Sequence, residues 1–248
     1  MANIQSLPIL LKELRLSAMA NAWQGLAHKA IKEQWQPEEY LAELCEMEAH
    51  HRHENRLKRL LKESQLPTGK QLSQYDFNEI TGISAQQMKL KMQNIDWLSQ
   101  GHNIILFGAS GLGKTHLAAA LGYALIEKSI RVKFTSSTAL VQQLQKSRED
   151  LGLEDMLKKL DKYELLILDD IGYVKKSDSE SQVLFELIAH RYERSSLLIT
   201  TNQAFSDWGS IFGDNMMTVA AIDRLVHHAD IFQIEGESYR KKQALKRN

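Results

Sequence analysis

One stretch of this chain combines glycines, a lysine and a threonine at a spacing that suits phosphate chemistry. Residues 108–115 match the pattern G-x-x-x-x-G-K-[ST], and the apolar run Asn103–Phe107 directly precedes them. Glycines let backbone N–H groups close around phosphate oxygens, and a helix that begins there points its positive dipole end at the anion. We therefore predict that a nucleotide triphosphate binds at Gly108, Ala109, Ser110, Gly111, Leu112, Gly113, Lys114, Thr115 and His116.

Within this loop two side chains have separate roles. Lys114 would place its charge between the β- and γ-phosphates, and the Thr115 hydroxyl would bind Mg²⁺. A glycine-rich surface turn is the alternative interpretation, but a strand before the loop and an apolar helix after it favour the phosphate site.

A pair of acids follows a second apolar run. Asp169 and Asp170 come directly after Leu165–Leu168. A buried strand that ends in two acids would deliver them to the carboxyl edge of a parallel sheet, beside a phosphate loop. We expect Asp169 to hold Mg²⁺ and Asp170 to orient the attacking water; an aspartate-rich turn is the alternative.

Three more polar residues follow later apolar segments. Asn202 closes the next run and would hold the attacking water or sense the γ-phosphate, although asparagine is also ordinary turn chemistry. Arg224 lies on an expected helix and would reach the nucleotide of a neighbouring subunit as an arginine finger, with an ion pair as the alternative. Arg240 would contact phosphates of its own subunit or belong to a plain basic tail.

The segments that must position these residues alternate between helix and strand from about residue 84 onward. Such alternation is typical of βαβ units, and so of an α/β fold with a parallel sheet covered on both faces. Two helical segments, 138–145 and 154–160, fit between the second and third strands, where a minimal crossover uses one. The five predicted strands are 103–107, 131–134, 165–168, 197–200 and 231–234.

The first 64 residues are expected to be all-helical. Pro8 suits a first helical position, and apolar residues follow it at roughly helical spacing as far as Met19. A second helix opens at Pro37 and runs to about Leu61. Breaking residues then place a boundary near 65–72, which predicts a helical domain, 1–66, and an α/β domain, 67–248.

Charge is balanced overall but unevenly distributed. The chain has 31 basic and 31 acidic residues and one cysteine, Cys45, which we expect in the core. A lone cysteine excludes an internal disulfide, and without a leader or a long apolar run the cytoplasm is the expected location.

His50, His51 and His53 lack a carboxylate or cysteine at ligand spacing, so we expect no zinc there. Candidate contacts to a phosphate backbone are Arg52, Arg56, Lys58, Arg59, Lys175 and Lys176.

The order of these motifs resembles that of AAA+ ATPases. The paired aspartates, the additional helix and Ser238-Tyr239-Arg240 look like the DnaA/DnaC branch of initiators and helicase loaders. More closely, the stretch from Phe77 to Trp97 that leads into the phosphate loop, together with the helical start, is similar to the IstB family of ATP-dependent transposition helpers. The likeness covers nearly the whole chain.

The resemblance implies an AAA+ ATPase that uses ATP and Mg²⁺ and assembles as an ATP-dependent homo-oligomer on duplex DNA, largely independent of sequence, to assist an IstA-like transposase. It implies that Asn202 is a first sensor, Arg224 the finger and Arg240 a second sensor. Asp170 stands where most AAA+ enzymes have a glutamate, and its shorter side chain predicts slow turnover. A DnaC-like helicase loader and a P-loop small-molecule kinase are the alternatives.

Overall fold

The computed structural model describes residues 4–172, 177–203, 207–208 and 215–239. It divides the chain into a helical unit, Met1–Arg59, and a sheet unit, Leu60–Asn248. The division lies inside helix α3 (Pro37–Ser64) and not at residue 66, because the end of this helix already packs within the sheet unit. Leu60 and Ser64 are buried, and the Lys133 ammonium donates to the carbonyl oxygen of Glu63 at 3.2 Å.

The helical unit contains α1 (Leu7–Glu13), α2 (Ser17–Glu33) and the first part of α3. The apolar spacing after Pro8 is divided between two helices, because Arg15 has a left-handed backbone (φ 56°) that ends the first. The carboxylate of Glu48 accepts hydrogen bonds from the backbone N–H groups of Ala18 and Met19 at 2.8 and 3.3 Å. Burial alone would raise the pKa of Glu48, but these bonds and Arg52 outweigh it and lower the pKa.

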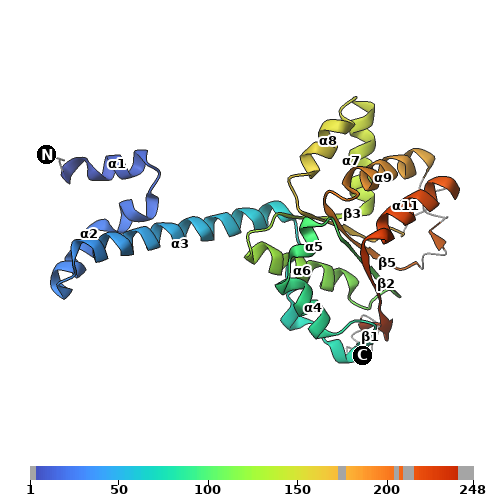
Figure 1. The fold of residues 1–248 in the computed structure, drawn as a ribbon, viewed down its shortest axis with the longest axis horizontal. Coiled ribbons are helices and arrows are strands. Elements are labelled where there is room, and N and C mark those ends of the chain that lie inside the picture. Colours follow the sequence, from blue (N-terminus) through green and yellow to red (C-terminus); the bar gives the residue numbers. More distant parts are fainter. Residues whose placement is uncertain (1–3, 173–176, 204–206, 209–214, 240–248) are drawn as a thin grey trace, which may run out of the picture. The chain divides into compact units, whose positions relative to one another are not determined.

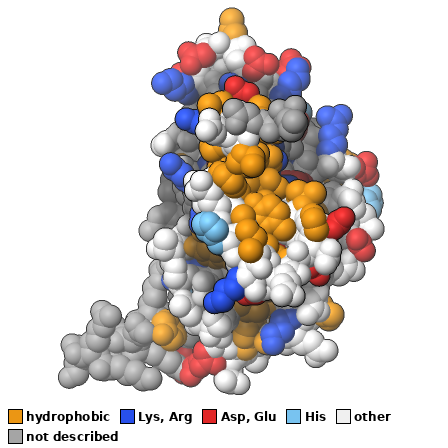
Figure 2. All heavy atoms as spheres, turned by 90° about the vertical axis from the view of Figure 1, so that its left-hand side faces the viewer, with side chains coloured by type: hydrophobic (Ala, Val, Ile, Leu, Met, Phe, Trp, Pro, Cys, Tyr) orange, Lys and Arg blue, Asp and Glu red, His pale blue; other side chains and the backbone are white. Residues whose placement is uncertain are grey.

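Apolar side chains remain exposed on this unit, and many hydrophobic side chains gather on the face shown in Figure 2. The exposed fractions of Ile4, Ile9 and Leu14 are 72, 61 and 66%. Cys45 is also exposed, so the expectation that it belongs to the core is wrong. Leu11, Met19 and Leu44 form the small buried core of this unit.

The sheet unit contains a five-stranded parallel sheet of order β3-β4-β5-β2-β6 (Figure 1). All five predicted strands are confirmed, with no end shifted by more than two residues. Their bounds are β2 Asn103–Phe107, β3 Val132–Ser136, β4 Leu165–Asp169, β5 Ser196–Thr201 and β6 Ala229–Gln233. β5 lies between β4 and β2, so the acids after β4 and the glycine loop after β2 lie on either side of the end of β5.

Helices cover both faces of this sheet, with α7, α9 and α11 on one side and α4 and α6 on the other (Figure 1). Alternate strand residues point to opposite faces, so Leu166 and Leu168 join the core under α7 and α9 while Ile167 faces Gly122 of α6. The two helices predicted between the second and third strands are confirmed as α7 and α8. Helix bounds are α4 Ala85–Gln93, α5 Asp96–Ser99, α6 Lys114–Glu127, α7 Ser137–Glu149, α8 Leu153–Leu160, α9 Asp178–Arg191 and α11 Asn215–His227.

Two short strands lie beside the main sheet. β1 (Ile80–Thr81) pairs antiparallel with β7 (Glu235–Gly236), which joins the segment before α4 to the segment after β6. In the part of the chain that the structure describes, no helix is long and apolar enough to span a membrane.

Candidate nucleotide-binding site

The glycine-rich loop connects β2 to α6 at the carboxyl edge of the sheet, the edge where the parallel strands end. Gly108 and Gly113 have positive φ angles of 150° and 82°. A Cβ on Gly108 would lie 2.1 Å from the carbonyl oxygen of Ile234, and one on Gly113 would lie 2.4 Å from the Tyr75 ring. Neither position tolerates a side chain, so the loop needs glycine for both its conformation and its packing.

Lys114 begins helix α6 and folds back over the loop. Its side chain is buried, and its ammonium donates to the carbonyl oxygens of Gly108 and Ala109 at 2.7 and 2.9 Å. A buried ammonium held by neutral carbonyls is a strong site for an anion, because phosphate oxygens supply the opposite charge that the carbonyls lack.

Thr115 and Asp169 meet at the same edge, as a shared Mg²⁺ site requires. The Thr115 hydroxyl lies 2.9 and 3.1 Å from the two carboxylate oxygens of Asp169. Burial raises the pKa of Asp169 above its ordinary value, although hydrogen bonds from Thr200 and Thr115 oppose the shift. A divalent cation here would stabilise the ionised carboxylate that burial disfavours.

Thr200, at the end of β5, connects the two aspartates. Its hydroxyl donates to the Asp169 carboxylate at 2.6 Å and accepts the backbone N–H of Asp170 at 2.9 Å. Asp170 itself is exposed and has a left-handed backbone, with φ of 57°. From the sequence, the polar chemistry after this strand was predicted for Asn202; the parallel register of β4 and β5 is what brings Thr200 to Asp169.

Asn202 follows β5 directly and is exposed at the carboxyl edge, between the strand of the glycine loop and the strand of the aspartates. The backbone nearby is tied to the loop, because the N–H of Gly108 donates to the carbonyl oxygen of Thr201 at 3.3 Å. The amide is therefore available at the edge where a γ-phosphate would lie.

Two segments distant in sequence pack against the loop. The Tyr75 hydroxyl donates to the carbonyl oxygen of Leu112 at 2.7 Å, and burial raises the pKa of Tyr75 to about 12, which keeps it protonated as a donor. The Tyr75 ring also contacts His116 edge-on at 5.3 Å. On another side the N–H of Tyr239 donates to the carbonyl oxygen of Gly111 at 3.1 Å. No sequence motif signalled the contacts of Tyr75.

Arg224 lies on α11 and contacts its own chain. It donates to the carbonyl oxygen of Ala220 at 3.0 Å, and its guanidinium stacks over the ring of Phe185 in α9 at 5.2 Å. A cation over an aromatic face is attracted by the ring, so this contact helps to hold the Arg224 side chain against α9. Arg240, predicted to contact phosphates, lies outside the described residues.

Basic residues on α3 occupy a different environment. Arg52, Arg56 and Arg59 fall on one face by their i, i+4, i+7 spacing. Arg52 is engaged within the helical unit, where it bonds Glu48 and the carbonyl oxygen of Arg15, both at 2.9 Å. Lys58 lies 3.8 Å from Glu54 and is largely exposed. Lys175 and Lys176 lie outside the described residues.

Taken together, the carboxyl edge provides a backbone cradle, a buried cation, a hydroxyl–carboxylate pair for a divalent ion and two exposed polar groups. These groups come from three adjacent strands. Such an arrangement suits a nucleoside triphosphate with its metal ion.

Comparison with known proteins agrees with this chemistry. The profile of the family described as IstB-like ATP binding protein matches residues 9–247. An insertion sequence ATP-binding protein of Sinorhizobium fredii is 47% identical over 96% of this chain and 80% of its own length. The ATP-binding protein of insertion sequence IS21 from Pseudomonas aeruginosa is 35% identical over 98% of this chain and 91% of its own.

Solved structures share the fold. The DnaC helicase loader superposes with a TM-score of 0.55 at 21% identity, over 68% of this chain and 98% of the loader. DnaA from Aquifex aeolicus, solved with AMPPCP bound, gives 0.57 at 18% identity, over 75% of this chain and 57% of DnaA. The fold is thus that of a AAA+ P-loop domain, as predicted, and the chain belongs to the family of IstB-like ATP-binding proteins.

Proposed function

We propose that this chain hydrolyses ATP with Mg²⁺ at the carboxyl edge of its sheet. The observation that best supports this proposal is the contact of the Thr115 hydroxyl with Asp169 at 2.9 Å, beside the buried ammonium of Lys114. Lys114 would neutralise the β- and γ-phosphates, and Thr115 and Asp169 would hold Mg²⁺ through oxygen ligands. When bound, Mg²⁺ supplies charge stabilisation for the transferred phosphoryl group.

Two exposed residues complete the proposed site. Asp170 orients the attacking water, and Asn202 senses the γ-phosphate from the neighbouring strand. The backbone N–H of Asp170 donates to the Thr200 hydroxyl, which holds this turn at the carboxyl edge and leaves the Asp170 side chain exposed there. Because an aspartate reaches less far than a glutamate, turnover is slow and suits a timed switch rather than a motor.

In the proposed reaction Arg224 reaches the nucleotide of a neighbouring subunit, so hydrolysis requires an ATP-dependent homo-oligomer. Arg240 acts as a second sensor within its own subunit. The exposed apolar residues of the helical unit suit a contact with another protein. We place the partner and oligomer contacts in the helical unit, Met1–Arg59, and the ATPase in the sheet unit, Leu60–Asn248.

The oligomer assembles on duplex DNA with little sequence preference and assists a transposase of the IstA kind, in the cytoplasm. This step rests on family membership and on relatives whose names tie them to insertion sequences. Exposed arginines and lysines on α3 suit the DNA backbone, with Arg56, Lys58 and Arg59 as its centre and Arg52, Lys175 and Lys176 as further candidates. An adjacent integrase-like gene would support the transposase partner; an adjacent helicase gene would contradict it.

Mixing two inactive variants tests the ATPase and its shared site. Arg224→Ala keeps its nucleotide site but lacks the finger, whereas Lys114→Ala has the finger but binds no nucleotide. Each variant alone should lack hydrolysis, and the mixture should regain part of it, because a finger from one subunit then meets a nucleotide in the other. Normal hydrolysis by Arg224→Ala alone, or no recovery in a mixture that does assemble, would overturn the shared site.

A further inference from the structure

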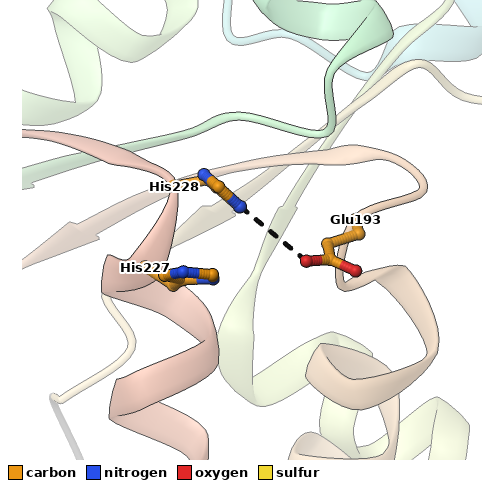
Figure 3. Close-up of side chains that lie close together, drawn as sticks. All are labelled: Glu193, His227 and His228. Atoms are coloured by element: carbon orange, nitrogen blue, oxygen red, sulfur yellow. Dashed lines mark ion pairs between the residues drawn. The ribbon is translucent and has the colours of Figure 1, made fainter.

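A second cluster of ligand-type side chains lies at the opposite edge of the sheet, where the strands begin. Glu193 follows α9 three residues before β5, and His227 and His228 join the end of α11 to β6. One ligand atom from each side chain lies within 4.8 Å of the other two, and Figure 3 shows the three side chains close together. Among the residues that the structure describes, no other group of three histidine, cysteine or acidic side chains meets this spacing.

We propose that Glu193, His227 and His228 bind a divalent transition metal ion of the Zn²⁺ class. Two imidazoles and one carboxylate are a ligand set that such ions favour, and they leave a position open for water. Ligand atoms on a tetrahedral zinc ion are about 3.3 Å apart. The Nε2 atom of His228 is already 3.7 Å from a carboxylate oxygen of Glu193, so this pair is close to that spacing, and His227 lies within 4.8 Å of both.

The backbone that carries these ligands is held in place. The N–H of Asn103, which begins β2, donates to the carbonyl oxygen of His228 at 2.7 Å. Glu193 adopts a left-handed backbone with φ of 57°, and its turn packs so closely on Gly101 that a Cβ there would lie 3.1 Å from the Glu193 Cα. Anchored ligands lower the ordering entropy that metal binding must overcome.

A neighbouring tyrosine hydroxyl is also within hydrogen-bond distance of the His227 ring. The Tyr192 hydroxyl lies 2.6 Å from Nδ1 of His227. With the proton on Nδ1 and donated to the tyrosine oxygen, Nε2 keeps its lone pair for a metal ion. This is the outer-shell support that metal-bound histidines generally have.

The site would connect two elements that pack together, because it joins the turn after α9 to the last turn of α11. Arg224 lies one turn before His227 and stacks on Phe185 of α9. An ion would therefore restrain the helix that carries the proposed finger. This consequence for Arg224 rests on the proposed function, whereas metal binding itself does not.

Titration of untagged, nucleotide-free protein with Co²⁺ tests the site. We expect one ion per chain with the visible absorption of low-coordinate Co²⁺, displaced by Zn²⁺. His228→Gln and Glu193→Gln should weaken binding by about tenfold or more. His190→Gln is the matched control: His190 lies 2.9 Å from Asp161, a histidine–carboxylate pair without a second imidazole, and its loss should leave binding unchanged.

Other outcomes would overturn the proposal. If His51→Gln with His53→Gln abolishes binding while His228→Gln does not, the ion binds α3. Absence of Co²⁺ binding by the wild type, or equal Co²⁺ binding by His228→Gln, would also overturn the proposal. Zn²⁺ at a hundredfold excess over its Kd should raise the Tm of the wild type by about 5 to 10 °C and leave that of a folded His228→Gln unchanged. None of these readouts depends on ATP hydrolysis.

Discussion

The carboxyl edge of the sheet and the basic face of α3 both present charged groups, but they hold them differently. At the edge, Lys114, Asp169 and Thr200 are buried wholly or in part. Lys114 donates to two loop carbonyls and Thr200 donates to Asp169, at 2.6 to 2.9 Å. On α3, Lys58 and its partner Glu54 are 73 and 48% exposed at 3.8 Å. Buried, bonded groups are positioned before a ligand arrives, whereas exposed pairs contribute little individually. One substitution should therefore disable the edge, and several should be needed on the helix.

We expect Lys114→Ala to cause the largest loss of function of any single substitution at the edge. Removal of the buried ammonium should abolish nucleotide binding and lower hydrolysis by about a hundredfold or more. Lys128→Ala, at the exposed far end of the same helix, is the matched control and should behave as the wild type. Fluorescent ATP-analogue binding and phosphate release measure both. Tight binding by Lys114→Ala would show that the edge is not the nucleotide site.

Thr200→Val asks whether positioning by a buried hydroxyl matters. The change is close to isosteric but removes the donor to Asp169 and the acceptor for the N–H of Asp170. We expect kcat to fall by about 10- to 100-fold with a small change in KM, because the metal ligand and the water-orienting acid lose their support.

Thr201→Val is its control. Thr201 is as buried as Thr200, but its hydroxyl accepts the backbone N–H of Gln203, whereas that of Thr200 accepts the N–H of Asp170 and donates to Asp169. Equal losses of kcat in the two variants would reduce the role of Thr200 to general packing of β5.

On α3 the same contrast predicts a graded effect. Reversal of Arg56, Lys58 and Arg59 to glutamate should weaken duplex binding and reduce the slope of log Kd against log salt by up to about three units, roughly one for each lost phosphate contact. Reversal of Lys12, Lys29 and Lys32 changes the net charge equally and serves as the control. An unchanged salt slope would remove this helix face from the DNA footprint.

The smallest effect concerns protonation of Asp169 in the absence of nucleotide. Because the folded chain raises the pKa of Asp169, its contribution to stability is present below the unfolded-state pKa and is lost as the pH rises through the folded-state pKa. Asp169→Asn carries no such loss, so its Tm at neutral pH should match or slightly exceed that of the wild type, although hydrolysis falls. A lower Tm that is specific to neutral pH would contradict the sign.

Local patterns in the sequence predicted much of this site. The glycine loop, the acids after β4 and the five strands each depend on short stretches of chain, and the structure confirms the loop geometry and the strands. Thr200 and Tyr75 could not be assigned in this way. Their partners lie 31 and 37 residues away, and the contacts arise only from strand register and from the packing of the segment before β1.

The helical unit shows what the spacing of apolar residues could not predict. Helical spacing indicated its helices, but neither the left-handed turn at Arg15 nor the exposure of Cys45 follows from spacing, because each depends on which faces of the helices pack together. The end of α3 gives a third case: breaking residues mark the end of the helix at Ser64, whereas packing sets the unit boundary at Arg59.

If a filled carboxyl edge controls assembly on DNA, the mass of the assembly must depend on the nucleotide. Mass photometry of the wild type with a short duplex should show an oligomer that forms with ATP and Mg²⁺ and disperses without them. Arg224→Ala should bind ATP but stay small under the same conditions. An assembly of the same mass with and without nucleotide, or an Arg224→Ala protein that assembles normally, would show that the filled edge does not control assembly.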